Sequence, residues 1–163
     1  MTFADTAALL QTLARDCGAR RILEVGTGHF TLSLAAMLPP DGMMISMDAD
    51  AASAGHARRQ LAAAGYADRV SVMVGEAARF LHKIAGPFDL IVQGGAPAMD
   101  EARHERLVAL LRPNGVLVTD NIGGTGESGP VVAFSHRLAA DPRLQTSFLP
   151  VGGGVAISVK RAS

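Results

Sequence analysis

The feature that most constrains the fold of this chain is a regular alternation of short apolar runs with segments of helical pattern. Each run is continuously apolar, which is typical of strands that are buried on both faces of a parallel sheet. The runs predicted as strands are 21–25, 43–47, 70–74, 88–92 and 115–119. Strands that alternate with helices predict an α/β fold in which helices cover both faces of the sheet.

Helical spacing, or a composition rich in good helix formers, marks the remaining segments. The predicted helices are 7–14, 31–38, 51–64, 77–84, 98–111 and 130–140. Two further apolar runs, 145–151 and 155–159, are joined by only three glycines, a link that permits only an antiparallel pair. We therefore expect residues 1–163 to form a single Rossmann-like domain with a doubly wound, mostly parallel seven-stranded sheet and an antiparallel C-terminal hairpin.

Charge and hydropathy exclude several classes of partner. Basic and acidic residues balance at 15 each, so the chain lacks the basic footprint of a nucleic-acid-binding protein. No apolar run approaches the roughly 20 residues of a membrane span, and no basic segment precedes the first apolar stretch. The lone cysteine, Cys17, excludes a disulfide framework. We expect a cytoplasmic protein that binds a small molecule and neither nucleic acid nor membranes.

The first strand-to-helix turn, Gly26-Thr27-Gly28, is the first candidate binding feature. In an open parallel sheet this turn lines the ligand crevice, and its glycines let the backbone approach a ligand closely. Glu24 adds a carboxylate that repels a pyrophosphate and favours a cationic ligand. S-adenosylmethionine (SAM) fits this description, because it carries an ammonium and a sulfonium and has no phosphate. Thr31 also replaces the third glycine of a dinucleotide-binding loop.

The ends of the next strands supply further candidates for the cofactor site. Asp48 ends the second strand at about the separation from the glycine turn at which an acidic residue binds ribose hydroxyls, and Ala49 follows it. Residues 75–77, which are Gly75, Glu76 and Ala77, end the third strand where an adenine ring would lie, and Gln93 ends the fourth. The competing interpretation is a structural turn followed by a helix that Asp48 or Asp50 caps.

These motifs, in their order, resemble those of class I SAM-dependent methyltransferases, and most closely the O-methyltransferases of the catechol and caffeoyl-coenzyme A type. The resemblance covers about residues 14–161. It rests on RILEVGTG at 21–28, LPPDG at 38–42, MDAD at 47–50, VGEA at 74–77, FDLI at 88–91, LRPNG at 111–115, TDN at 119–121 and LPVG at 149–152. It implies that Glu24 and Gly26 bind the methionine part of SAM, Asp48 the ribose, and residues 75–77 the adenine.

The resemblance also implies a divalent metal at two acidic residues and an asparagine, and here the chain departs from the pattern. Asp120 and Asn121 match the second and third ligands, but Gly94 stands where the first carboxylate belongs, and no lysine follows it. A glycine side chain cannot bind a metal, so we expect no tightly bound divalent cation. His29, in the cofactor loop, and Asp120 remain the candidate catalytic bases, with His104 as a weaker one.

Two more departures concern the surroundings of the site. The glycine loop is shorter than the family's, and the helices that the family places before residue 1 to cover the substrate are expected to be missing. The site would then be open or covered by a partner subunit, which makes a homodimer our expectation. The predicted function is SAM-dependent O-methylation of a small molecule. The alternatives are a catalytically silent SAM-binding subunit, which Gly94 and Pro97 favour, and an NAD-binding oxidoreductase, which Glu24 disfavours.

Overall fold

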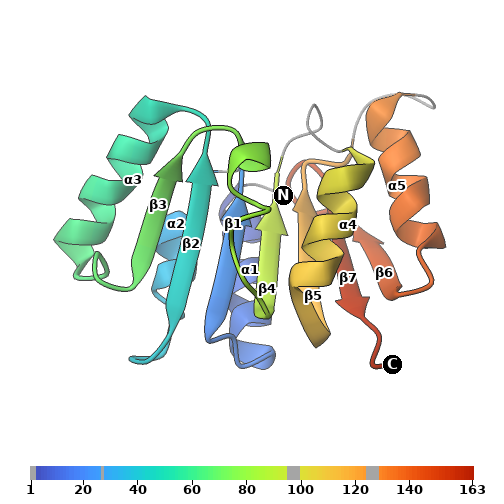
Figure 1. The fold of residues 1–163 in the computed structure, drawn as a ribbon, viewed down its shortest axis with the longest axis horizontal. Coiled ribbons are helices and arrows are strands. Elements are labelled where there is room, and N and C mark those ends of the chain that lie inside the picture. The colour runs from blue at the N-terminus through green and yellow to red at the C-terminus, as the bar shows by residue number, and fades with distance from the viewer. Residues whose placement is uncertain (1–2, 27, 95–99, 124–128) are drawn as a thin grey trace.

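Seven strands form one sheet in the computed structural model, which describes residues 3–26, 28–94, 100–123 and 129–163. The strands are β1 (Arg21–Val25), β2 (Met43–Asp48), β3 (Val70–Val74), β4 (Phe88–Gln93), β5 (Leu111–Asp120), β6 (Leu144–Leu149) and β7 (Val155–Lys160). Their order is β3-β2-β1-β4-β5-β7-β6 (Figure 1). The first five are parallel, whereas β7 runs antiparallel to both β5 and β6. The predicted mixed sheet and its C-terminal hairpin are confirmed.

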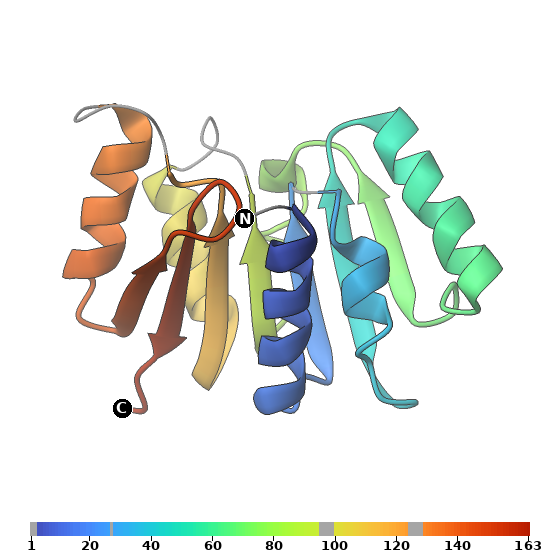
Figure 2. The ribbon, with the colours of Figure 1, turned by 180° about the vertical axis from the view of Figure 1, so that it is seen from behind.

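Helices cover both faces of this sheet. They are α1 (Phe3–Asp16), α2 (Thr31–Ala35), α3 (Ala51–Ala64), α4 (Glu101–Leu110) and α5 (Pro130–Ala140). Figure 1 shows α4 and α5 in front of the sheet, and Figure 2 shows α1 and α2 on the opposite face. Among the described residues, no helix combines the length and the apolar character needed to cross a membrane.

The core lies in two layers because the central strands contribute alternate side chains to opposite faces of the sheet. In β1, Ile22 packs with Leu10 and Leu34 of the α1 and α2 layer. Its neighbour Leu23 packs with Leu107, on the layer that includes α4 and α5. Burying a side chain of this size stabilises the fold by roughly 1.5–3 kcal/mol. Burial on both faces explains why the strands read as continuous apolar runs.

Helix α3 begins and ends at the residues that its sequence favours. The Asp50 carboxylate accepts hydrogen bonds from Ala52 N at 3.3 Å and Ser53 N at 3.1 Å, which caps the first turn. Gly65 ends the helix at φ +84°, a conformation that glycine adopts without strain. These caps fix the start of α3 directly after β2, so Asp48 lies at the boundary between strand and helix.

The helix predicted over 77–84 is wrong: the structure has a 3₁₀ turn at Ala77–Arg79. The reason lies in the carbonyl groups that follow this turn. The Arg106 side chain donates to Leu81 O at 2.8 Å and to Ile84 O at 2.7 Å. Because these carbonyls have a partner outside the segment, the backbone is satisfied without a continuous helix.

Candidate active site

The carboxyl ends of the parallel strands lie at one edge of the sheet, and backbone hydrogen bonds hold the residues that follow them. Gly26 N donates to Met47 O at 2.9 Å, which joins the turn after β1 to β2. Gly94 N donates to Val25 O at 3.0 Å, which joins the end of β4 to β1. The glycine turn is therefore fixed between its two neighbouring strands, at the edge where α/β proteins bind ligands.

Glu24 anchors the first residues of α2 and strand β2 beneath the glycine turn. Its carboxylate is fully buried and accepts hydrogen bonds from Thr31 Oγ1 at 2.5 Å, Ser46 Oγ at 2.8 Å and Phe30 N at 3.1 Å. A buried carboxylate is tolerated where donors of this kind surround it. Glu24 therefore sets the path of the chain from the turn into α2.

Gly28 and Asp48 are brought together at this edge. Gly28 has φ +62°, and a side chain there would collide with Asp48 Oδ2 and lie 2.8 Å from Ser53 Oγ. The other carboxylate oxygen, Asp48 Oδ1, accepts a hydrogen bond from Asp50 N at 2.9 Å. The acidic residue predicted for the ribose thus lies against the predicted glycine turn. Thr27, also predicted to bind the cofactor, lies outside the described residues.

The segment predicted to surround adenine borders a cavity of about 380 Å³. Gly75 N donates to Asp48 O at 2.9 Å, so the residues after β3 are tied to the end of β2. Ala49 is exposed beside this junction. The cavity is lined by Glu76, Ala77, Ala78, Leu81, His82, Asp100, Ala102, Arg103 and Arg106. The lining combines apolar side chains with charged and polar ones, which suits a small ligand that has both apolar and polar groups.

The ends of β4 and β5 carry the remaining candidates. Gln93 is buried, and its Nε2 donates to Thr119 Oγ1 at 3.0 Å, so this amide bridges the two strands. At Asp120, burial raises the pKa of the carboxyl, while a hydrogen bond from Asn121 N and the charge of His29 act in the opposite direction. The two candidate bases, His29 and Asp120, therefore lie close enough to interact across the site.

Comparison with known proteins accounts for this arrangement. A family described as O-methyltransferase matches residues 1–161, almost the whole chain. The chain belongs to this O-methyltransferase family. It is thus a member of a family of SAM-dependent methyltransferases of the caffeoyl-CoA and catechol type, as its motifs predict.

Three relatives illustrate the likeness. A catechol O-methyltransferase of Niastella koreensis is 34% identical over 92% of this chain and 77% of its own length. A caffeoyl-CoA O-methyltransferase of Eucalyptus globulus is 28% identical over 96% of this chain and 73% of its own length. The crystal structure of the O-methyltransferase TomG from Streptomyces achromogenes, in complex with SAM, is 28% identical and superposes with a TM-score of 0.87, covering 99% of this chain and 82% of its own. All three are longer than this O-methyltransferase.

The residues at the metal position of this O-methyltransferase form a poor set of ligands for a divalent cation. Among the described residues that match the expected ligands, Asp120 is the one carboxylate, and the Asn121 side chain lies against the turn after β6, where a Cβ on Gly153 would come within 2.6 Å of Asn121 Oδ1. Gly94 has no side-chain donor, and the sequence of residues 95–99, Gly-Ala-Pro-Ala-Met, adds none. Protein sites for hard cations are built from several oxygen ligands and commonly include more than one carboxylate. The donors that the described residues supply at this position do not fit a tightly bound divalent cation.

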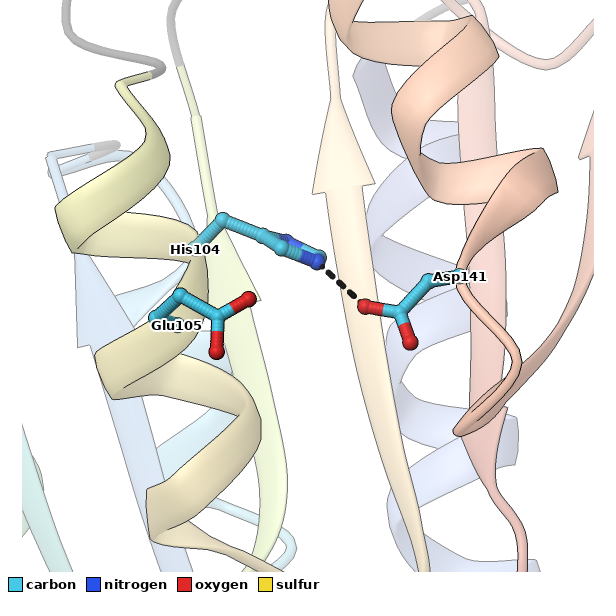
Figure 3. A group of neighbouring side chains, drawn as sticks. All are labelled: His104, Glu105 and Asp141. Carbon is cyan, nitrogen blue, oxygen red and sulfur yellow. Dashed lines mark hydrogen bonds and ion pairs between the residues drawn. The ribbon is translucent and has the colours of Figure 1, made fainter.

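His104 serves a different purpose from the one predicted for it. Its buried ring faces Asp141 between α4 and the end of α5, with His104 Nε2 2.8 Å from Asp141 Oδ2 (Figure 3). The group His104, Glu105 and Asp141 has the spacing of metal ligands, but Arg143 already binds Glu105 at 2.7 Å and Asp141 at 2.6 Å. The hydrogen bond from Arg143 outweighs the effect of burial and lowers the pKa of Asp141. These four side chains form an ion-pair network that joins two helices.

Three side chains near the site were not predicted from the sequence as site residues. Ser46 and Thr31 donate to Glu24, and Ser46 did leave a signal, because a serine within a buried strand needs a hydrogen-bond partner. Arg103 reaches the end of β1, where its Nη2 donates to Val25 O at 3.4 Å. Arginine in the first turn of a helix is normally a surface residue, so the sequence carries no signal for this contact.

Proposed function

We propose that this chain binds SAM at the carboxyl edge of the sheet and transfers its methyl group to an oxygen of a small molecule. The observation that carries the proposal is the contact between Gly28 and Asp48. It puts a carboxylate that can accept hydrogen bonds from ribose hydroxyls directly against the glycine turn, at the edge of the sheet where α/β proteins bind nucleosides. The SAM complex of the relative TomG, which has the same fold, supports the assignment.

Each part of the cofactor has a proposed partner. Gly26, Thr27 and Gly28 bind the methionine part with their backbone, and Glu24 holds that turn in place from below. Asp48 accepts hydrogen bonds from the ribose hydroxyls, with Ala49 beside the sugar. The adenine lies along Gly75, Glu76 and Ala77, at the cavity that these last two residues help to line. Gln93 supports this arrangement from the end of β4.

The reaction would be a direct displacement. An oxygen of the acceptor attacks the methyl carbon, the bond between that carbon and the sulfonium sulfur breaks, and S-adenosylhomocysteine leaves with the electron pair. Asp120 takes the hydroxyl proton of the acceptor, with His29 as its neighbour. Because the sulfonium already supplies a good leaving group, alignment of the acceptor contributes much of the rate.

We further propose that this transfer needs no tightly bound divalent cation. Support comes from the donor set, in which Asp120 and Asn121 are the side-chain oxygens at the expected position and Gly94 replaces a carboxylate. Such a set lacks the charge that magnesium or calcium requires. Acceptor activation then depends on the protein's own side chains.

A transfer assay tests both statements. The protein is incubated with SAM and a panel of catechols, phenols and hydroxycinnamoyl esters, in EDTA or in magnesium, and methylated products are detected by mass spectrometry. We expect a methyl ether product in both conditions. Product in magnesium alone would refute independence from metal. Normal binding of SAM with no product from any acceptor would instead support the silent SAM-binding subunit, which the missing carboxylate at Gly94 favours.

A further inference from the structure

Arg103 extends from helix α4 towards the glycine turn after β1. Its backbone N donates to the capping carboxylate of Asp100 at 2.6 Å, which fixes the residue in the first turn of the helix. Its half-buried guanidinium donates from Nη2 to Val25 O at 3.4 Å. A Cβ on Gly26 would lie 3.7 Å from the same nitrogen. The arginine thus packs directly against the residue that opens the turn.

Three segments converge at the Val25 carbonyl. Val25 ends β1, Gly94 N from the end of β4 donates to its oxygen at 3.0 Å, and Arg103 from α4 adds a charged donor. Burial lowers the pKa of Arg103, and the carboxylates of Asp100 and Glu76 act in the opposite direction, so two negative charges lie near the guanidinium. Gly94 N is the closer of the two donors, and Arg103 adds a second, longer contact that links α4 to the residue before Gly26.

We propose that Arg103 is a positioning residue for the cofactor, which acts through Val25 and Gly26 to hold the turn that receives the methionine part of SAM. This inference rests on the proposed function, because it takes SAM as the ligand of the turn. Arg103 does not touch the reacting atoms in this account. Its effect is on the shape of the backbone that binds the amino-acid end of the cofactor.

Arg106 provides a matched comparison within the same helix and the same cavity. It lines the cavity together with Arg103, but its guanidinium donates to Leu81 O and Ile84 O, after the 3₁₀ turn, whereas that of Arg103 donates to the end of β1. Replacing either arginine by methionine removes one guanidinium, with its charge and donors, and leaves an unbranched apolar side chain at the same wall. The two variants differ in whether the turn at Gly26 loses its charged donor.

The test is calorimetric titration of Arg103→Met, Arg103→Gln and Arg106→Met with two ligands, S-adenosylhomocysteine and adenosine. Adenosine lacks the amino-acid part, so it does not use the Gly26 turn. Loss of a charged hydrogen bond predicts that both Arg103 variants bind S-adenosylhomocysteine about tenfold more weakly and adenosine within about threefold of the wild type. Arg106→Met leaves the Leu81 and Ile84 carbonyls, in the segment that follows the proposed adenine site, without their donor, so it should weaken binding of both ligands by the same factor.

Steady-state kinetics and a rescue variant separate positioning from a general loss of structure. Arg103→Met should raise KM for SAM and leave kcat close to the wild-type value, since the turn contributes to binding. Arg103→Lys keeps a charged donor and should recover part of the affinity. The inference would be overturned if the Arg103 variants lost the same affinity for both ligands. It would also be overturned if Arg106→Met showed the same selective loss for S-adenosylhomocysteine as Arg103→Met. A wild-type protein that binds neither SAM nor S-adenosylhomocysteine would overturn the proposed function, and this inference with it.

Discussion

The carboxylate of Asp48 lies directly against Gly28, so the end of β2 and the turn after β1 leave no space between them for a side chain. Gly28 also has φ +62°, which side-chain-bearing residues rarely adopt. Two independent constraints, backbone conformation and contact, therefore require glycine at this position. The contact joins the two elements that the proposed function assigns to the methionine and ribose parts of one cofactor.

Gly28→Ala is expected to abolish high-affinity binding of S-adenosylhomocysteine, because the new methyl group must displace Asp48 or Ser53. Gly18→Ala is the matched control. Gly18 has a nearly equal φ of +60°, but nothing lies within 4 Å of a Cβ built there. Backbone strain should cost each variant about 1 kcal/mol of unfolding free energy, and the displaced side chains should add to this loss in Gly28→Ala, as urea denaturation measures. An equal effect of the two substitutions on calorimetric affinity would contradict the assignment of Gly28.

Asp48→Ala should weaken binding of S-adenosylhomocysteine by about tenfold or more, because the ribose hydroxyls lose a charged acceptor. Asp50→Ala tests whether this effect is merely structural. Asp50 caps α3 through Ala52 N and Ser53 N, so its loss should cost about 1 kcal/mol of stability and little affinity. If Asp50→Ala weakens binding as much as Asp48→Ala in the same titration, Asp48 acts only as part of the helix boundary.

Glu24→Gln should destabilise the fold and weaken cofactor binding together. An amide nitrogen cannot accept the hydrogen bonds that Thr31, Ser46 and Phe30 N donate to the buried carboxylate, so at least one donor is left unpaired at a cost of about 1–3 kcal/mol. Ser46→Ala removes a single donor and should lower the stability of the fold by less. Thermal unfolding and titration of both variants measure the two effects. A Glu24→Gln variant with wild-type stability would contradict this role of Glu24.

Asp141→Asn should lower the unfolding free energy by about 3 kcal/mol at neutral pH, because it leaves His104 and Arg143 without a buried partner charge. The comparison is Asp41→Asn, which breaks an ion pair with Arg20. That pair has side chains 61% and 64% exposed, and its loss should cost less than about 1 kcal/mol. Similar losses of unfolding free energy in the two variants would show that the buried network stabilises the fold no more than an exposed ion pair does.

The same network predicts how stability depends on pH. Hydrogen bonds from Arg143 lower the pKa of Asp141 in the folded state below its ordinary value, which in an unfolded chain is about 3.9. Such a group contributes stability above the unfolded pKa and loses it as the pH falls towards the folded pKa. Wild-type stability should therefore decline as the pH drops below about 5. In Asp141→Asn, the unfolding free energy measured by urea titration should decline less steeply across that pH range.

Much of the fold was predictable because local chemistry and long-range packing agree. The continuous apolar runs, such as residues 21–25, correspond to strands buried on both faces, and Gly65 ends α3 as its conformational freedom suggests. The three-glycine link does join antiparallel strands. The glycine turn and Asp48 could be placed at one edge, since parallel strands end on the same side of a sheet.

What the sequence did not predict depends on contacts between distant segments. The segment 77–84 has the composition of a helix, but Arg106 from α4 binds its carbonyls. From the sequence, His104 was a weaker candidate base, and only the fold shows that Asp141 lies opposite its ring. Arg103 meets Val25 across 78 residues of sequence. The homodimer stays a prediction.

Binding of SAM at this edge of the sheet is tested by calorimetric titration of the wild-type protein with S-adenosylhomocysteine. We predict a saturable isotherm for one site per chain, with a dissociation constant well below about 1 mM, and the same titration with NAD should give no binding. The absence of S-adenosylhomocysteine binding at millimolar concentration, or tighter binding of NAD, would contradict the account.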